Sequence, residues 1–121
     1  KKDKQDKVAL AIGSMTNAIN ETNIKIDTVQ SSIMDELKKD RADNQEYRAK
    51  QCRARILQFN DEIYRKIRHT KESFDDVIAE IDSYEDYCKE HPEFPNFKAV
   101  AAIKNIKDTY LQCLRDGDFL S

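Results

Sequence analysis

The chain has few residues that interrupt helices: only two glycines and two prolines occur among its 121 residues. Hydrophobic residues make up 39% of the sequence and charged residues 36%, with many helix formers such as Lys, Glu and Ala. Such a composition predicts an all-α protein. No apolar run is long enough to span a bilayer, so no transmembrane helix is expected within these residues.

A strong charge imbalance is also lacking, since the net charge is only −2. No global field therefore draws the protein to nucleic acid or to anionic lipid. The three cysteines, Cys52, Cys88 and Cys113, are odd in number, lie far apart and form no C-x-x-C motif. We expect them to be reduced and half-buried in the core.

Motifs for catalysis or metal binding are missing as well. Cys88 and His91 have the spacing of two ligands on one helix, but a zinc site needs about four ligands. No glycine-bearing turn provides an oxyanion site beside a cysteine nucleophile. We therefore predict no catalytic residue, no metal and no cofactor, and we do not expect an enzyme.

The most regular feature is a heptad pattern near the start of the chain. Its members alternate at spacings of four and three and form what we call the seam: Val8, Ile12, Met15, Ile19, Thr22, Ile26, Val29 and Ile33. This pattern is typical of an α-helix that pairs with copies of itself or with a partner helix. It predicts a coiled coil in the segment from Asp3 to Leu37.

The residue types of the seam favour a homo-oligomer with more than two chains. Isoleucine occupies each a position, and the d positions are mostly β-branched, which favours a trimer over a dimer. The flanking e and g positions are mainly uncharged, so interhelical salt bridges do not set the partner. An alternative is a hairpin in which this helix packs onto later parts of the same chain.

The rest of the chain predicts a spacer and three shorter helices. Residues 38–46 contain no large apolar residue and read as a helical spacer or a hinge. Amphipathic patterns then predict helices over 47–69, 70–90 and 96–115. We thus expect two domains: residues 1–46, with the coiled-coil helix and spacer, and residues 47–121, with a small three-helix bundle.

Local signals support these helix boundaries. Thr70 and Asn96 are suitable N-cap residues, and Gly117 suits the left-handed position after a helix. Pro92 and Pro95 end the preceding helix. The apolar positions of the last helix are Val100, Ile103, Ile106, Tyr110, Cys113 and Leu114, and Phe119 and Leu120 form a tail expected to pack back on the core.

Charged side chains of the first two of these shorter helices, 47–69 and 70–90, suggest a contact surface for a protein partner: Arg48, Arg55, Asp75, Asp76 and Glu80. Basic residues between Arg48 and Arg68 could track phosphates, but acidic residues dilute them and no aromatic platform accompanies them. Nucleic acid is therefore not expected as a partner. The simpler interpretation of these charges is ion pairing within helices.

Several stretches of the C-terminal half resemble small prophage-encoded helical proteins of clostridial-type Gram-positive bacteria, often described as holin-like or uncharacterised. The stretches are Arg55–Ile63, His69–Val77, Ile81–Phe94, Asn105–Lys107 and Phe119–Leu120. The resemblance covers about residues 50–120 and implies phage origin. In such proteins an N-terminal hydrophobic segment often precedes a charged helix, and no catalytic residues are established for them.

Three functions follow as hypotheses. The first is the soluble part of a lysis-associated, holin-like protein, anchored to the membrane through a segment upstream of Lys1. The second is a small phage protein that binds and inhibits a host defence or nucleic-acid enzyme, and the third is a tail or connector component of the virion. All three place the chain in the bacterial cytoplasm or on the cytoplasmic face of the membrane.

Overall fold

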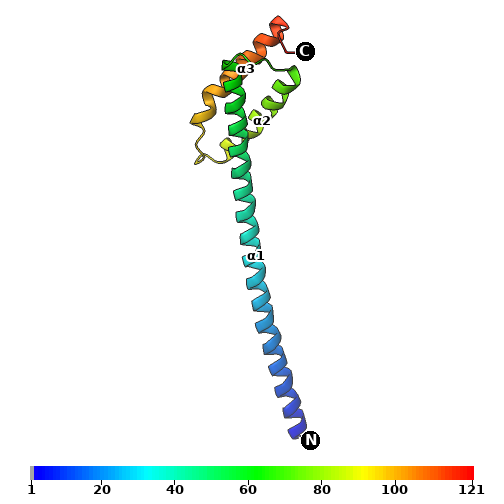
Figure 1. Cartoon of the computed structure of the whole chain (residues 1–121). Helices are drawn as coiled ribbons and strands as arrows, with labels where there is room; N and C mark the ends of the chain where they lie inside the picture. Colours follow the sequence, from blue (N-terminus) through cyan, green and yellow to red (C-terminus); the bar gives the residue numbers. More distant parts are fainter. Residues whose placement is uncertain (1) are drawn as a thin grey trace. The chain divides into compact units, whose positions relative to one another are not determined.

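The computed structural model describes residues 2–121 and contains three α-helices and, within that range, no strand. The helices are α1 (Lys2–Tyr64), α2 (Lys71–Glu90) and α3 (Phe97–Asp116) (Figure 1). The prediction of an all-α fold, with one long helix followed by shorter ones, is confirmed. Lys1, and the upstream segment to which the predicted membrane anchor belongs, lie outside the described residues.

α1 runs without interruption through the predicted spacer, so residues 38–46 are helical. Neither Gly nor Pro occurs between Gly13 and Pro92, and the spacer consists of residues that a helix accommodates. The chain divides into two units, Lys1–Ala42 and Asp43–Ser121.

α1 ends at Tyr64 rather than at His69, where the apolar pattern predicted the end. Lys66 adopts a left-handed conformation with φ of 64°. Its N–H donates to the Ile63 carbonyl at 3.0 Å, and the N–H of Ile67 donates to the Glu62 carbonyl at 2.9 Å. These two bonds form a Schellman motif, which satisfies the last carbonyls of the helix. Ile67, which follows Ile63 at helical spacing in the predicted helix 47–69, is consequently exposed.

α2 begins as its sequence predicts. The hydroxyl oxygen of Thr70 accepts a hydrogen bond from the Ser73 N–H at 3.1 Å, which confirms Thr70 as the N-cap. The buried face consists of Phe74, Val77, Ile81 and Tyr84. The helix ends at Glu90, two residues before Pro92.

α3 corrects two predictions. Asn96 precedes the helix but its side chain makes no capping hydrogen bond, so it does not serve as the predicted side-chain cap. Val100 and Leu114 are exposed instead of buried, and the core face is made by Ala99, Ala102, Ile103 and Ile106. The left-handed Gly117, with φ of 63°, is confirmed at the end of the helix. Small alanines on the inner face allow the helix backbone to approach its neighbours closely.

Unit Asp43–Ser121 has one hydrophobic core, to which the C-terminal part of α1, α2 and α3 all contribute. Its largest fully buried side chains are Ile56, Ile81, Tyr84 and Ile106. Burying an isoleucine side chain contributes about 1.5–3 kcal/mol to the stability of the unit. Cys52, Cys88 and Cys113 are free and partly buried around this core, as predicted.

The C-terminal tail contributes one aromatic side chain to the core. The Phe119 ring lies 5.6 Å from the Phe74 ring and 5.7 Å from the Tyr110 ring, measured between centroids. The Leu120 side chain is exposed, but its N–H donates to the His69 carbonyl at 2.9 Å. The prediction that the tail packs back is therefore correct for Phe119 and wrong for the Leu120 side chain.

Candidate functional site

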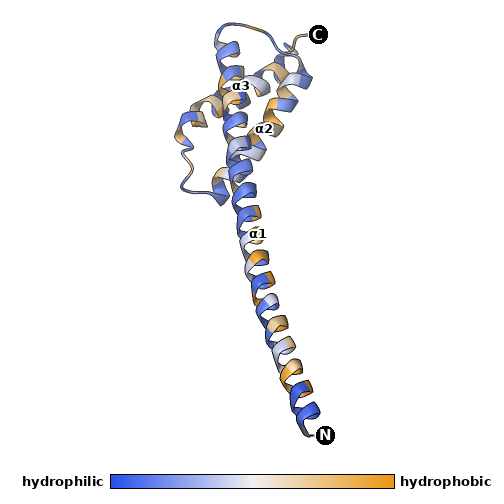
Figure 2. Cartoon of the chain, turned by 60° about the horizontal axis from the view of Figure 1, so that its bottom comes forward, coloured by the Kyte–Doolittle hydropathy of each residue, from blue (hydrophilic) through white to orange (hydrophobic). Residues whose placement is uncertain are grey.

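The seam residues lie on the helix of unit Lys1–Ala42 with their apolar side chains exposed. The seven that are large and hydrophobic have exposed fractions from 47% for Ile26 to 64% for Met15. Apolar residues recur along this part of α1 in Figure 2, between polar ones. The unit consists of one helical segment, so it holds no second element that could cover the seam.

Thr22 is the one polar member of the seam, and its hydroxyl is already satisfied within the helix. The hydroxyl donates to the Ala18 carbonyl at 2.9 Å, and Thr16 and Thr28 make the same bond to the carbonyls four residues before them. A buried hydroxyl without a partner would cost free energy. Because this donor is used, the γ-methyl of Thr22 can be buried at a helix interface without an unsatisfied hydroxyl.

An isolated helix of this kind gains little stability from itself, since helices depend mainly on packing of an apolar face. Covering the remaining exposed area of one seam side chain would contribute about 1 kcal/mol, half of the value for full burial. Leu10 and Ile24 are also exposed, but their heptad positions place them on the opposite face. A partner on the seam would leave both of them in solvent.

The five residues of the predicted contact surface do not form one continuous patch. Three of them, Arg55, Asp76 and Glu80, line a shallow cleft of about 330 Å³ between α1 and α2. Arg55 forms an ion pair with Glu80 across these helices, and the carboxylate raises the pKa of Arg55. Arg48 instead borders a separate hollow beside Tyr84 and Tyr87.

Asp75 faces α3 rather than this cleft. Its carboxylate accepts from Lys71 Nζ at 3.1 Å and from the Tyr110 hydroxyl at 3.0 Å. These two hydrogen bonds, that of Lys71 first, lower the pKa of Asp75 below its ordinary value. Two of the acidic side chains in the predicted surface, Asp75 and Glu80, are thus engaged within the unit.

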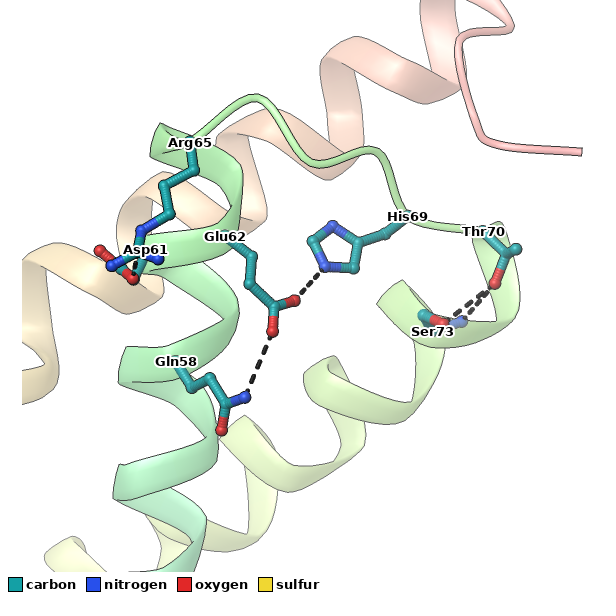
Figure 3. Close-up of polar contacts among 7 residues, drawn as sticks. All are labelled: Gln58, Asp61, Glu62, Arg65, His69, Thr70 and Ser73. Carbon is teal, nitrogen blue, oxygen red and sulfur yellow. Dashed lines mark hydrogen bonds and ion pairs between the residues drawn. The ribbon is translucent and has the colours of Figure 1, made fainter.

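His69 fixes the turn between α1 and α2, a role that the sequence did not indicate (Figure 3). Its Nε2 lies 2.6 Å from Oε2 of Glu62, its ring stacks on Phe59 with centroids 3.9 Å apart, and its side chain is only 11% exposed. The buried Nδ1 has no hydrogen-bond partner among the described residues. The hydrogen bond between Nε2 and the Glu62 carboxylate is therefore the polar contact that orients the ring.

A cleft of about 520 Å³ in unit Asp43–Ser121 lies beside this turn. Its lining includes Ile67, Arg68, His69 and Cys113, and Arg68 Nη2 pairs with Asp118 Oδ1 at 3.0 Å. Partial burial raises the pKa of the Cys113 thiol. A thiol with a raised pKa is a poor nucleophile, so the cleft does not present an activated cysteine.

Within residues 2–121, no group of three or more His, Cys, Asp or Glu side chains is arranged to hold a metal ion. Across the same residues, no helix combines the length and the apolar character that crossing a membrane requires.

Comparisons with protein-family models, with curated proteins and with solved structures found no match. The resemblance of residues 50–120 to prophage proteins thus remains a prediction from the sequence.

Proposed function

We propose that this chain is a non-enzymatic assembly protein that associates with copies of itself through the seam. One observation carries the proposal: a regular heptad of apolar side chains, from Val8 to Ile33, lies about half exposed on a helix. An exposed apolar stripe of this length is typical of an interface between proteins. The three-helix unit would then present its own surface to a partner protein.

The composition around the seam supports a second copy as its occupant. The e positions of the seam hold Thr16, Asn23 and Gln30, and the g positions Ala18, Lys25 and Ser32. These flanks carry almost no charge that would require a differently charged partner helix. Partner choice then depends on the shapes of the a and d side chains, which identical chains supply. For parallel chains, the β-branched d positions favour three copies.

Placing aspartates in the middle of the seam tests this proposal. We expect Ile19→Asp combined with Ile26→Asp to give monomers by light scattering, while the unchanged protein is oligomeric. Burying carboxylates in the interface would cost several kcal/mol without a partner charge. The matched control is Leu10→Asp combined with Ile24→Asp, which adds the same charges to the opposite face and should leave the oligomer intact.

A monomeric unchanged protein, or an oligomer that survives both substitutions in the seam, would contradict self-association through these residues. An oligomer lost equally in the control pair would show that added charge, and not the seam, is responsible.

The biological setting that we propose depends on the sequence resemblance alone: a prophage-encoded, lysis-associated protein held at the membrane by a segment upstream of Lys1. A stretch of about 20 apolar residues in the upstream coding sequence would support this setting. A short polar start would contradict it. The alternative of an acidic inhibitor of a host enzyme is less favoured, because Asp75 and Glu80 are neutralised by partners within the unit.

A further inference from the structure

We infer that the copies joined by the seam run antiparallel, so that the partner is a second copy of this chain in the reverse direction. The inference rests on the proposed self-association and adds the direction of the partner to it. Two features of the described helix favour this arrangement: the layers that the seam residues form, and the charges that follow the last seam residue.

An antiparallel alignment exists in which every seam residue faces another seam residue. In antiparallel coiled coils an a position faces a d position, so each layer joins one isoleucine to a different residue. The pairs are Ile12 with Val29, Ile19 with Thr22, Ile26 with Met15, and Ile33 with Val8. Sliding one copy by a heptad in either direction leaves two seam residues facing polar or charged positions. The apolar pattern therefore selects one alignment.

This alignment also distributes side-chain volume more evenly. In a parallel arrangement, each layer contains one residue type, so all-isoleucine layers alternate with smaller layers such as those of Val8 and Thr22. The antiparallel layers instead each combine an isoleucine with a valine, threonine or methionine. Close-packed interfaces favour layers of similar volume, because voids remove contacts and excess volume forces strain.

The charges beyond Ile33 give the second argument. The heptad positions that continue the seam hold Glu36, Asp40 and Asp43, all exposed in the described chain. In parallel chains each of these carboxylates would face its own copy, and like charges at an interface repel. In the antiparallel alignment Glu36 comes opposite Gln5, beside Lys4.

Reversing one chain replaces the layer of Glu36 with its own copy by a layer of Glu36 with the uncharged Gln5, at both ends of the interface. Lys4 flanks that layer and has the charge complementary to Glu36. One like-charged pair, Lys4 with Lys39, remains at the flank, where both long side chains can extend into solvent. An antiparallel pairing closes with an even number of chains, and the trimer expected for parallel chains would not form.

Disulfide trapping in the full-length chain tests the direction. We propose single variants Val8→Cys and Ile33→Cys, mixed under reducing conditions and then oxidised with glutathione, with the linked peptides identified by mass spectrometry. In the antiparallel alignment the two new cysteines face each other. We expect the bridge between position 8 and position 33 to exceed the 8–8 and 33–33 bridges by about tenfold or more, since only that pair has a high effective concentration.

The matched controls are Leu10→Cys and Ser31→Cys, which point away from the seam and should give no enriched bridge. The unchanged protein gives the background of bridges among the native Cys52, Cys88 and Cys113. Each variant must keep the light-scattering mass of the unchanged protein. Preferred 8–8 and 33–33 bridges in an intact oligomer would overturn the antiparallel direction and leave self-association standing, whereas a monomeric unchanged protein would overturn both.

Discussion

The carboxylate of Asp75, on α2, accepts one hydrogen bond from Lys71 of the same helix and one from Tyr110 of α3. The second bond links the two helices. Both bonds favour the ionised carboxylate, which is why the pKa of Asp75 is lowered in the folded chain. A lowered carboxylate pKa stabilises the folded state at pH above the ordinary value. That contribution is lost as the pH falls through the folded-state pKa, below the ordinary value.

We predict that Tyr110→Phe raises the pKa of Asp75 toward its ordinary value while the ring keeps its place beside Phe74 and Phe119. The stability that depends on ionised Asp75 should then be smaller, and its loss on acidification should be complete at a higher pH. A pH titration of the Asp75 carboxyl signal by NMR measures the first effect, and urea unfolding at several pH values measures the second. Tyr64→Phe is the control, since Tyr64 is exposed and does not contact Asp75.

The charged residues show how far the sequence could predict individual side chains. Arg55 and Glu80 were assigned to a possible contact surface, and nothing in their spacing indicated that they pair with each other across α1 and α2. The contacts of His69 with Phe59 and Glu62 were not predicted either, because they depend on the path of the turn after Tyr64. Contacts between elements depend on the angle at which the helices pack, and the apolar pattern of a single helix does not determine that angle.

The start of α2 is an element whose boundary depends on one hydroxyl. Thr70 accepts from the Ser73 N–H, one of the first amides of the helix, which otherwise has no partner in the helix. We predict that Thr70→Ala lowers the free energy of unfolding of the three-helix unit by about 1 kcal/mol. Urea unfolding followed by near-ultraviolet circular dichroism measures this change, since that signal reports the packing of aromatic rings.

Thr70→Ser supplies the control for the cap, because it retains the hydroxyl oxygen and should stay close to the unchanged protein. Equal destabilisation by both substitutions would assign the effect to the lost methyl group instead of the capping bond.

Helix ends were predictable where a residue type enforces them and not where tertiary geometry does. Thr70, Gly117 and the two prolines gave correct boundaries because each has an intrinsic backbone preference. The end of α1 was placed too late, because the left-handed residue there is Lys66 rather than glycine. At Asn96 a good capping residue occurs, but its backbone is helical, so the side chain does not reach the first amides.

At the scale of the whole chain, the two units differ in what stabilises them. Unit Asp43–Ser121 buries its own core, whereas unit Lys1–Ala42 is a helix with an exposed apolar face. Every aromatic residue also lies in the second unit, since no Phe, Tyr or Trp precedes Tyr47. Near-ultraviolet circular dichroism therefore reports only the core of that unit, and far-ultraviolet circular dichroism reports the helices of both.

These two signals should separate on heating. The proposed self-association would stabilise the first unit by mass action, so its helix should unfold at a temperature that rises with protein concentration. A tenfold increase in protein concentration stabilises a dimer by about 1.4 kcal/mol. It should raise the unfolding midpoint of the first unit, seen in the far-ultraviolet signal, by roughly 5 °C. The near-ultraviolet midpoint should not move, because the core of the second unit is closed within one chain.

The variant that carries Ile19→Asp and Ile26→Asp supplies the control for this experiment. Its first unit should lose most of its helix at all concentrations, since a single helix without a packed face is marginal in water. The near-ultraviolet transition should remain as in the unchanged protein, because both substitutions lie far in sequence from the core residues. If instead the far-ultraviolet signal of the unchanged protein melts at the same temperature over a hundredfold range of concentration, the exposed seam does not stabilise the first unit through association.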